Sequence, residues 1–226
     1  MKLPSFFEQV PVLRVRDPLA EVLACAEGGV LEYTYADVVR LTGHSCPTVA
    51  ASYWLTWRAM QELYPDELPV RGGVKVEFRE DARTGSTGVV ASVVQMLTGA
   101  AGGSGFKGLG GRFGRAGLIR FSPGLPLSLR FTRLDNGAQV DAGADLSLPP
   151  QDPALDELLQ RCATGRADAQ ALAELGRLWQ LRVQHLLLDL AWDPGVFVVR
   201  RVQRRLPAPP STGLRLSPAC RPGAGG

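Results

Sequence analysis

The sequence has few of the residues from which covalent or metal-bound scaffolds are built. It contains four cysteines and two histidines in 226 residues, and no two cysteines form a Cys-x-x-Cys pair. A disulfide scaffold needs a denser and more regular set, so these cysteines are interpreted as reduced thiols. They are Cys25, Cys46, Cys162 and Cys220.

Long apolar runs are absent too. No stretch reaches the roughly 20 apolar residues that a membrane-spanning helix needs. The opening residues, Met-Lys-Leu-Pro-Ser-Phe-Phe-Glu, lack the apolar centre of a secretory signal peptide. We therefore expect a cytoplasmic protein with no membrane partner.

Charge of one sign is only slightly in excess, with a formal net charge of +3. Part of that excess lies in the run Arg200-Arg201-Val-Gln-Arg204-Arg205. Such a run could contact RNA or an acidic partner, but it is more typical of a solvated strand end, so nucleic acid is not an expected partner. The hydrophobic content of 45% is enough to bury a core, and 226 residues favour one domain with extensions over two full domains.

The stretch 37–54 places His44 and Cys46 one residue apart, directly before a predicted amphipathic helix. Pro47 suits the first position of that helix, where its missing N–H costs nothing. Cys46 is then the N-cap, close to unpaired backbone N–H groups. The partial positive charge of a helix start favours the thiolate, which is the form that attacks electrophiles and binds metals. His44 adds a proton acceptor or a second metal ligand.

These residues also carry a family resemblance. The run Thr-Gly-His-Ser-Cys-Pro, followed by a helix and later by Gln-Met-Leu-Thr-Gly and Gly-Phe-Lys-Gly, resembles the E-subunit family of formylmethanofuran dehydrogenase (FmdE-like proteins) over residues 37–121. The resemblance implies an α+β domain with a metal, often zinc, near the His-x-Cys pair. It does not imply formylmethanofuran chemistry, because such domains also occur outside methane metabolism.

The chain departs from that family in its sulfur content. Many members carry a cysteine in the second conserved block and another directly after its Thr-Gly, whereas residues 87–102 of this chain contain none. Members with a C-terminal zinc ribbon also have Cys-x-x-Cys pairs, which this sequence lacks. A metal site of the family type is therefore missing at least one expected sulfur ligand.

Glycine is very dense between residues 99 and 117. Residues 103–108 formally match G-x-G-x-x-G, but the dinucleotide fingerprint needs a strand before it, and here a helix is predicted instead. Dense glycine still lets backbone N–H groups approach an anion, and nearby cations add positive charge. The alternative is a set of tight backbone crossings in the core or at a dimer contact. The expected residues of an anion or substrate site are Gly105, Lys107, Gly108 and Arg112, with Arg115 adding charge.

Periodicity and turn signals predict an α+β fold in which a mixed or antiparallel sheet packs with helices. The helix at 89–97 is apolar all round, so we expect it to be buried. Helices are predicted at 17–24, 34–41, 48–63, 89–97, 152–162 and 168–190. Strands are predicted at 74–78, 118–121, 127–133, 138–141 and 195–202, and residues 31–35 form a short strand or a turn. The expected divisions are an N-terminal arm with a short helix (1–30), the domain of the resembled family (31–145), a helical and strand extension packed on it (146–206) and a disordered tail (207–226).

The first hypothesis for His44 and Cys46 is a site for zinc or another divalent metal. The protein would then be an accessory protein of an oxidoreductase or a small metalloenzyme. The sequence does not identify a third ligand. The candidates are Cys162, His185, Glu77, Asp81 or a residue of a second copy in a homodimer.

Two other functions use the same residues. In a metal-free enzyme, Cys46 attacks the small-molecule substrate, His44 moves the proton and the glycine-rich loop holds an oxyanion or phosphate. In a non-catalytic module, the chain binds a metal or a pterin-type cofactor for a partner oxidoreductase, as the name of the resembled family suggests. A purely structural role for both residues is the remaining interpretation.

Overall fold

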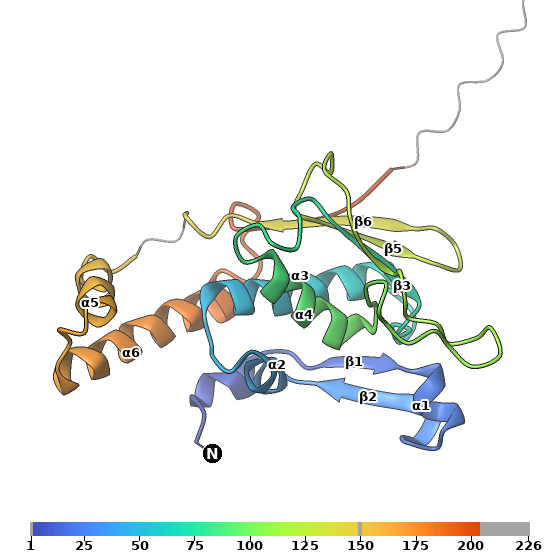
Figure 1. Ribbon diagram of the computed structural model, residues 1–226, viewed down its shortest axis with the longest axis horizontal. Coiled ribbons are helices and arrows are strands. Elements are labelled where there is room, and N and C mark those ends of the chain that lie inside the picture. Colours follow the sequence, from blue (N-terminus) through green and yellow to red (C-terminus); the bar gives the residue numbers. More distant parts are fainter. Residues whose placement is uncertain (1, 149–150, 204–226) are drawn as a thin grey trace, which may run out of the picture.

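The computed structural model describes residues 2–148 and 151–203, and it confirms the α+β class (Figure 1). The predicted tail at 207–226 lies outside the described residues. The helices are η1 (Ser5–Gln9), α1 (Pro18–Val22), η2 (Glu27–Gly29), α2 (Tyr35–Thr42), α3 (Pro47–Leu63), α4 (Thr87–Thr98), α5 (Ala154–Ala163), α6 (Ala169–Gln184) and the π-helical turn η3 (His185–Asp189). The strands are β1 (Leu13–Arg16), β2 (Val30–Tyr33), β3 (Val74–Phe78), β4 (Ile119–Phe121), β5 (Leu129–Arg133), β6 (Gln139–Ala144) and β7 (Phe197–Arg201).

The main sheet has five strands in the order β4-β3-β5-β6-β7. Only β3 and β4 run parallel, because α4 and the glycine-rich segment carry the chain back between them. The other neighbours are antiparallel, and Gly137, at φ +67°, lies in the predicted hairpin turn between β5 and β6. Strand β7 extends the sheet next to β6, so residues from the C-terminal extension complete its edge.

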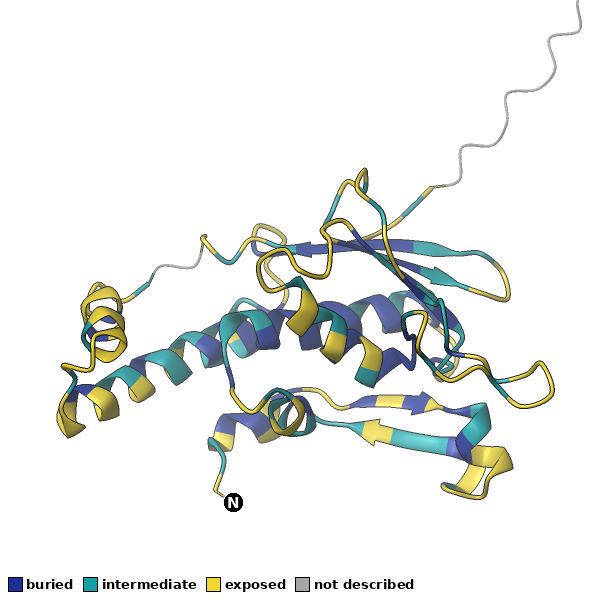
Figure 2. Ribbon diagram, viewed as in Figure 1, coloured by how far each residue is buried: buried dark blue, intermediate teal, exposed yellow. Residues whose placement is uncertain are grey.

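Helix α3 lies between the sheet and a separate two-stranded ribbon of β1 and β2 (Figure 1). Its residues are buried on most sides, as the dark colouring at the centre of Figure 2 shows. The Tyr53 hydroxyl lies 2.6 Å from the carbonyl oxygen of Pro11 and 3.0 Å from that of Tyr33. The Trp54 indole N–H donates to the carbonyl of Ala191. The aromatic side chains of α3 therefore fasten both early and late parts of the chain to the same helix.

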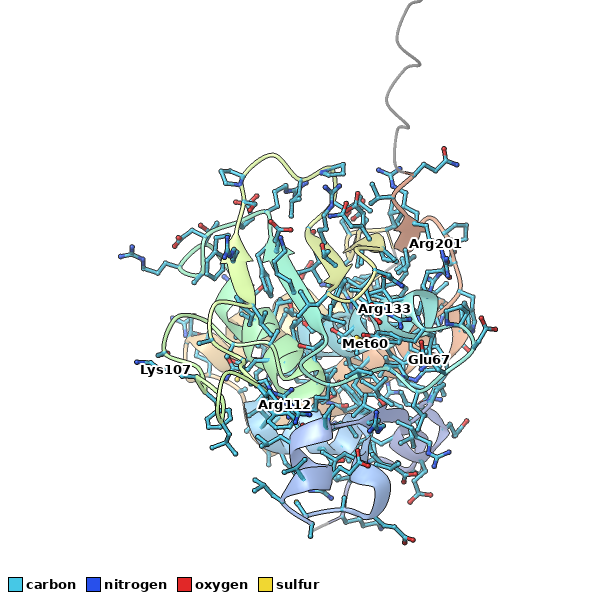
Figure 3. The ribbon with its side chains drawn as sticks, turned by 90° about the vertical axis from the view of Figure 1, so that its right-hand side faces the viewer. Met60, Glu67, Lys107, Arg112, Arg133 and Arg201 are labelled. Atoms are coloured by element: carbon cyan, nitrogen blue, oxygen red, sulfur yellow. The ribbon has the colours of Figure 1, made fainter. Side chains whose placement is uncertain are left out.

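The last turn of α3 is fixed to the sheet by Arg133, one of the residues labelled in Figure 3. Its guanidinium donates to the Leu63 carbonyl at 3.1 Å and pairs with Glu67 at 2.6 Å. It also lies over the Tyr64 ring, 3.9 Å from the centroid. Cations at a helix C-terminus interact favourably with its carbonyl groups, so this arginine stabilises the end of the central helix.

Residues before β2 and after β6 take part in the same core as α3. Phe7 packs edge-on against Tyr35 with ring centroids 4.8 Å apart, and both belong to the main buried cluster. At the other end of the chain, Leu186 and Phe197 join that cluster. Helix α5 and the start of α6 instead form a small cluster of their own, which projects from the body of the protein (Figure 1).

Helix α4 differs from the prediction that it is buried all round. Val93, Val94 and Leu97 are buried, but Ser92 and Gln95 face solvent and Val89 is 36% exposed. The helix is covered on one side only, by α3 and α2. Within residues 2–148 and 151–203, no helix has both the length and the apolar character needed to cross a bilayer.

Candidate functional site

The corner between α2 and α3 has the local structure that its sequence predicts. Cys46 is the N-cap of α3, and its Sγ accepts a hydrogen bond from the Val49 N–H at 3.5 Å. Pro47 is the first helical residue. Gly43 ends α2 at φ +76°, a left-handed conformation that glycine adopts without a steric cost. Cys46 itself is half-buried.

His44 is exposed and turned back toward the end of α2. Its Nδ1 lies 3.0 Å from the carbonyl oxygen of Thr42, which can only accept. This contact favours the tautomer in which Nδ1 carries the proton, leaving the lone pair of Nε2 available. No hydrogen bond joins His44 to Cys46 in the described part of the chain.

Ser45, the residue between them, is anchored in the protein. Its Oγ lies 2.9 Å from the Tyr35 hydroxyl, and burial raises the pKa of Tyr35, so that hydroxyl stays protonated. The Ser45 carbonyl accepts the Trp179 indole N–H at 2.9 Å. Helix α6 therefore covers the inner side of this turn, and His44 faces solvent on its outer side.

Three of the residues considered as a third metal ligand form pairs with other side chains. His185 Nδ1 lies 2.8 Å from Asp189, Glu77 pairs with Lys75 at 3.0 Å, and Asp81 pairs with Arg83 at 3.6 Å. Cys162 is exposed on α5. Over the described ranges, the structure has no group of three or more His, Cys, Asp or Glu residues that could hold a metal ion. A single chain thus offers His44 and Cys46 without a third donor from these ranges.

The glycine-rich loop, residues 102–117, folds largely onto itself. Leu109 and Arg112 exchange two backbone hydrogen bonds of 2.9 Å, and the Arg115 N–H donates to the Phe106 carbonyl at 2.7 Å. A Cβ on Gly105 would lie 2.4 Å from the Ala101 Cβ, and one on Gly108 would lie 2.2 Å from the Arg112 carbonyl oxygen. Both glycines therefore permit close backbone crossings. Several backbone N–H groups of the loop are already used in hydrogen bonds within the loop.

The two predicted cations of this loop lie in different surroundings. Both are exposed, and Figure 3 shows Lys107 at the outer side of the loop and Arg112 nearer to the N-terminal ribbon. The Arg112 guanidinium lies over the Phe113 ring, 4.7 Å from its centroid. Arg112 and Phe113 also line a cavity of about 330 Å³ that Lys107 does not line.

That cavity borders a buried ionic group that sequence reasoning did not identify. Asp17 is 3% exposed, and it pairs with Arg71 at 2.9 Å and with Arg115 at 2.7 Å. The same carboxylate caps α1 by accepting the Leu19 N–H at 2.9 Å. Arg71 and Arg115 line the cavity together with Arg112. We call Arg71, Arg112 and Arg115 the arginine cluster.

The Asp17 carboxylate depends on this cluster for its charged state. Burial alone would raise its pKa, but the hydrogen bond from Arg71 and the charge of Arg115 outweigh burial and lower the pKa. A group whose pKa is lowered by folding contributes stability above its unfolded-state pKa, and that contribution is lost as the pH falls through the folded-state value.

We predict that acid removes the contribution of Asp17 to stability below about pH 4. Above that range the Asp17→Asn variant should unfold at lower urea concentration than the wild-type protein, because only the charged carboxylate pairs with two arginines. The difference in the free energy of unfolding should shrink as both proteins are taken to about pH 2. A difference that stays constant across this pH range would contradict the prediction.

No family model matches the sequence. No curated protein matches it either.

Proposed function

We propose that the protein binds zinc or another divalent metal through His44 and Cys46, in the manner of the E-subunit family of formylmethanofuran dehydrogenase. The observation that carries the proposal is the contact between His44 Nδ1 and the Thr42 carbonyl. Histidines that bind metals commonly donate one ring N–H to a carbonyl or carboxylate and bind with the other nitrogen. Thr42 provides the same orientation for His44.

Cys46 fits the other half of such a ligand pair. Its sulfur lies at the start of a 17-residue helix and accepts a backbone N–H, and the thiolate is the form in which a cysteine binds a metal. Imidazole nitrogen and thiolate sulfur are the ligands that zinc prefers in tetrahedral sites. The residue after Thr98-Gly99, where many family members carry a cysteine, is here the buried Ala100.

We infer that the remaining positions are filled by a second copy of the chain. Two copies of the turn at 44–46 would supply two imidazoles and two thiolates, which is a complete tetrahedral set. The exposure of His44 on the outer side of the turn supports this arrangement. A metal with four protein ligands has no open position for substrate, so an accessory role beside an oxidoreductase is favoured over a metalloenzyme.

The test is to measure zinc content and molecular mass in solution for three purified proteins. We expect the wild-type chain to be a dimer with one metal ion per two chains. Cys46→Ser should lose the metal and the dimer while it stays folded, because serine is itself a good N-cap. Cys162→Ser removes an exposed cysteine elsewhere and should change neither quantity.

Other results have distinct meanings. Equal zinc in the wild-type and Cys46→Ser proteins would exclude Cys46 as a ligand. One metal ion in a monomer would contradict a shared site and leave metal binding intact. A zinc-free protein whose Cys46 is alkylated faster than the exposed Cys162 would favour the metal-free alternative, in which the hydrogen-bonded sulfur of Cys46 is a nucleophile.

A further inference from the structure

We propose that the arginine cluster beside the glycine-rich loop binds the phosphate group of a small molecule. This site is separate from His44 and Cys46. The turn at 44–46 lies against α6, whereas the arginine cluster pairs with Asp17 at the start of α1. Figure 1 shows α1 and α6 in opposite halves of the protein.

The first observation is an unsatisfied donor. Arg115 is 7% exposed, and its Nη1 is buried without a hydrogen-bond partner among the described residues. A buried N–H group of a charged side chain is costly to leave unpaired. Nη1 lies between Gly72 and Gly99, where added Cβ atoms would be 2.1 and 2.4 Å away, and both Arg115 and Gly72 line the cavity. Arg115 therefore keeps an unpaired donor next to Gly72, which lines the cavity with it.

The second observation is the charge balance. The cavity is lined by three arginines, and Asp17 is the carboxylate that pairs with two of them. Each Asp17 oxygen already accepts from one of these arginines: Oδ2 from Arg71 and Oδ1 from Arg115. About two positive charges remain uncompensated among these four side chains, which matches a phosphate monoester, since it carries about −1.5 to −2 near pH 7. Guanidinium groups also match phosphate oxygens in geometry.

The third observation concerns the body of the ligand. A cavity of about 330 Å³ is large enough for more than inorganic phosphate alone. Its wall includes the apolar residues Pro18, Val70 and Phe113. Arg112 lies at the exposed side over Phe113, so its guanidinium can contact a phosphate while the ring contacts an apolar or aromatic group. The structure therefore favours a small phosphate ester over the free ion.

Arg112 offers the clean variant for a test, because no ion pair joins it to another described residue. We expect inorganic phosphate to bind the full chain at one saturable site in calorimetric titrations at constant ionic strength. Phenyl phosphate should bind more tightly because it adds the contact with Phe113. Arg112→Gln should raise Kd for both ligands roughly tenfold or more, which corresponds to the loss of one charge-assisted hydrogen bond.

Lys107→Gln is the matched control, because it removes the same charge from the same loop outside the cavity. It should leave Kd unchanged. Cys46→Ser should also leave Kd unchanged, so the result does not depend on the metal proposal. Absence of saturable binding for both ligands would overturn the inference, as would an equal loss in Lys107→Gln and Arg112→Gln. Equal affinity for inorganic and phenyl phosphate would overturn the assignment of an ester.

Discussion

Replacing Asp17 by Ala should lower the free energy of unfolding by about 3–5 kcal/mol, which is the usual cost of removing one partner from a buried ionic group. Asp17 is 3% exposed, and the Arg115 guanidinium that it pairs with is buried as well. Without the carboxylate, Arg115 keeps its charge although it is only 7% exposed. The N-cap of α1 is lost at the same time, at about 1 kcal/mol.

Equilibrium unfolding in urea near pH 7 measures this loss directly. Asp17→Asn separates the loss of the ion pairs from the loss of the helix cap. The amide oxygen can still accept the Leu19 N–H, but it carries no charge to pair with the arginines. We expect Asn to recover at most about 1 kcal/mol of the loss. An Asn variant as stable as the wild-type protein would show that the ion pairs contribute nothing beyond the helix cap.

Replacing Gly72 by Ala is the second change with a large expected effect. Gly72 has φ +82°, and a Cβ there would lie 2.1 Å from Arg115 Nη1. The left-handed backbone alone costs a non-glycine residue about 1–2 kcal/mol. The overlap additionally forces the guanidinium away from Asp17, so the expected total loss is at least about 3 kcal/mol.

Gly111→Ala is the control for the backbone term. Gly111 has a similar φ of +79°, and no heavy atom lies within 4 Å of the position that its Cβ would take. In the same urea titration, the free energy of unfolding of Gly111→Ala should fall by only about 1–2 kcal/mol, which is the cost of placing alanine in a left-handed backbone conformation. Equal losses at both glycines would mean that Arg115 moves aside freely, and the buried pair would then be weaker than its geometry indicates.

The local parts of the fold were predictable because their causes lie within a few residues of one another. The Cys46-Pro47 helix start is found as predicted, and the Asp17 cap and the Thr34–Asp37 capping box begin two other predicted helices. Each depends on a side chain reaching a backbone N–H two or three positions away. Such contacts do not depend on residues that are distant in the sequence.

The arginine cluster was not predictable in this way. Arg115 and Asp17 are separated by 98 positions, and Arg71 and Asp17 by 54. The residues next to Asp17 in the sequence indicate a helix cap, and Asp17 does cap α1. They give no indication of its ion pairs with Arg71 and Arg115. Arg112 and Arg115 were expected to add charge near an anion, but the residues that line the cavity with them, Pro18 and residues 70–73, are distant in the sequence. The exposed side of α4 was not predictable for the same reason, because composition does not reveal which faces of a helix are covered by other elements.

The His44 and Cys46 corner falls between these cases. The turn and the helix start follow from local signals, and they are where the sequence places them. The orientation of the imidazole does not follow from local signals, because His44 could contact either the Thr42 carbonyl or the Cys46 sulfur. In the structure it contacts the Thr42 carbonyl. Whether a metal joins the two side chains remains the proposal tested by the zinc measurements described above.

The bond from Trp54 to the Ala191 carbonyl has a consequence for the newly made chain. Helix α3 leaves the ribosome long before Ala191 and the edge strand that contains Phe197 are synthesised. Until then Trp54 lacks the Ala191 carbonyl and the Trp192 ring that contact it in the folded protein, and this part of the incomplete chain is open to chaperone capture or aggregation. Closure of the domain must therefore wait for its final strand, so translation rather than local helix formation sets the earliest moment of folding.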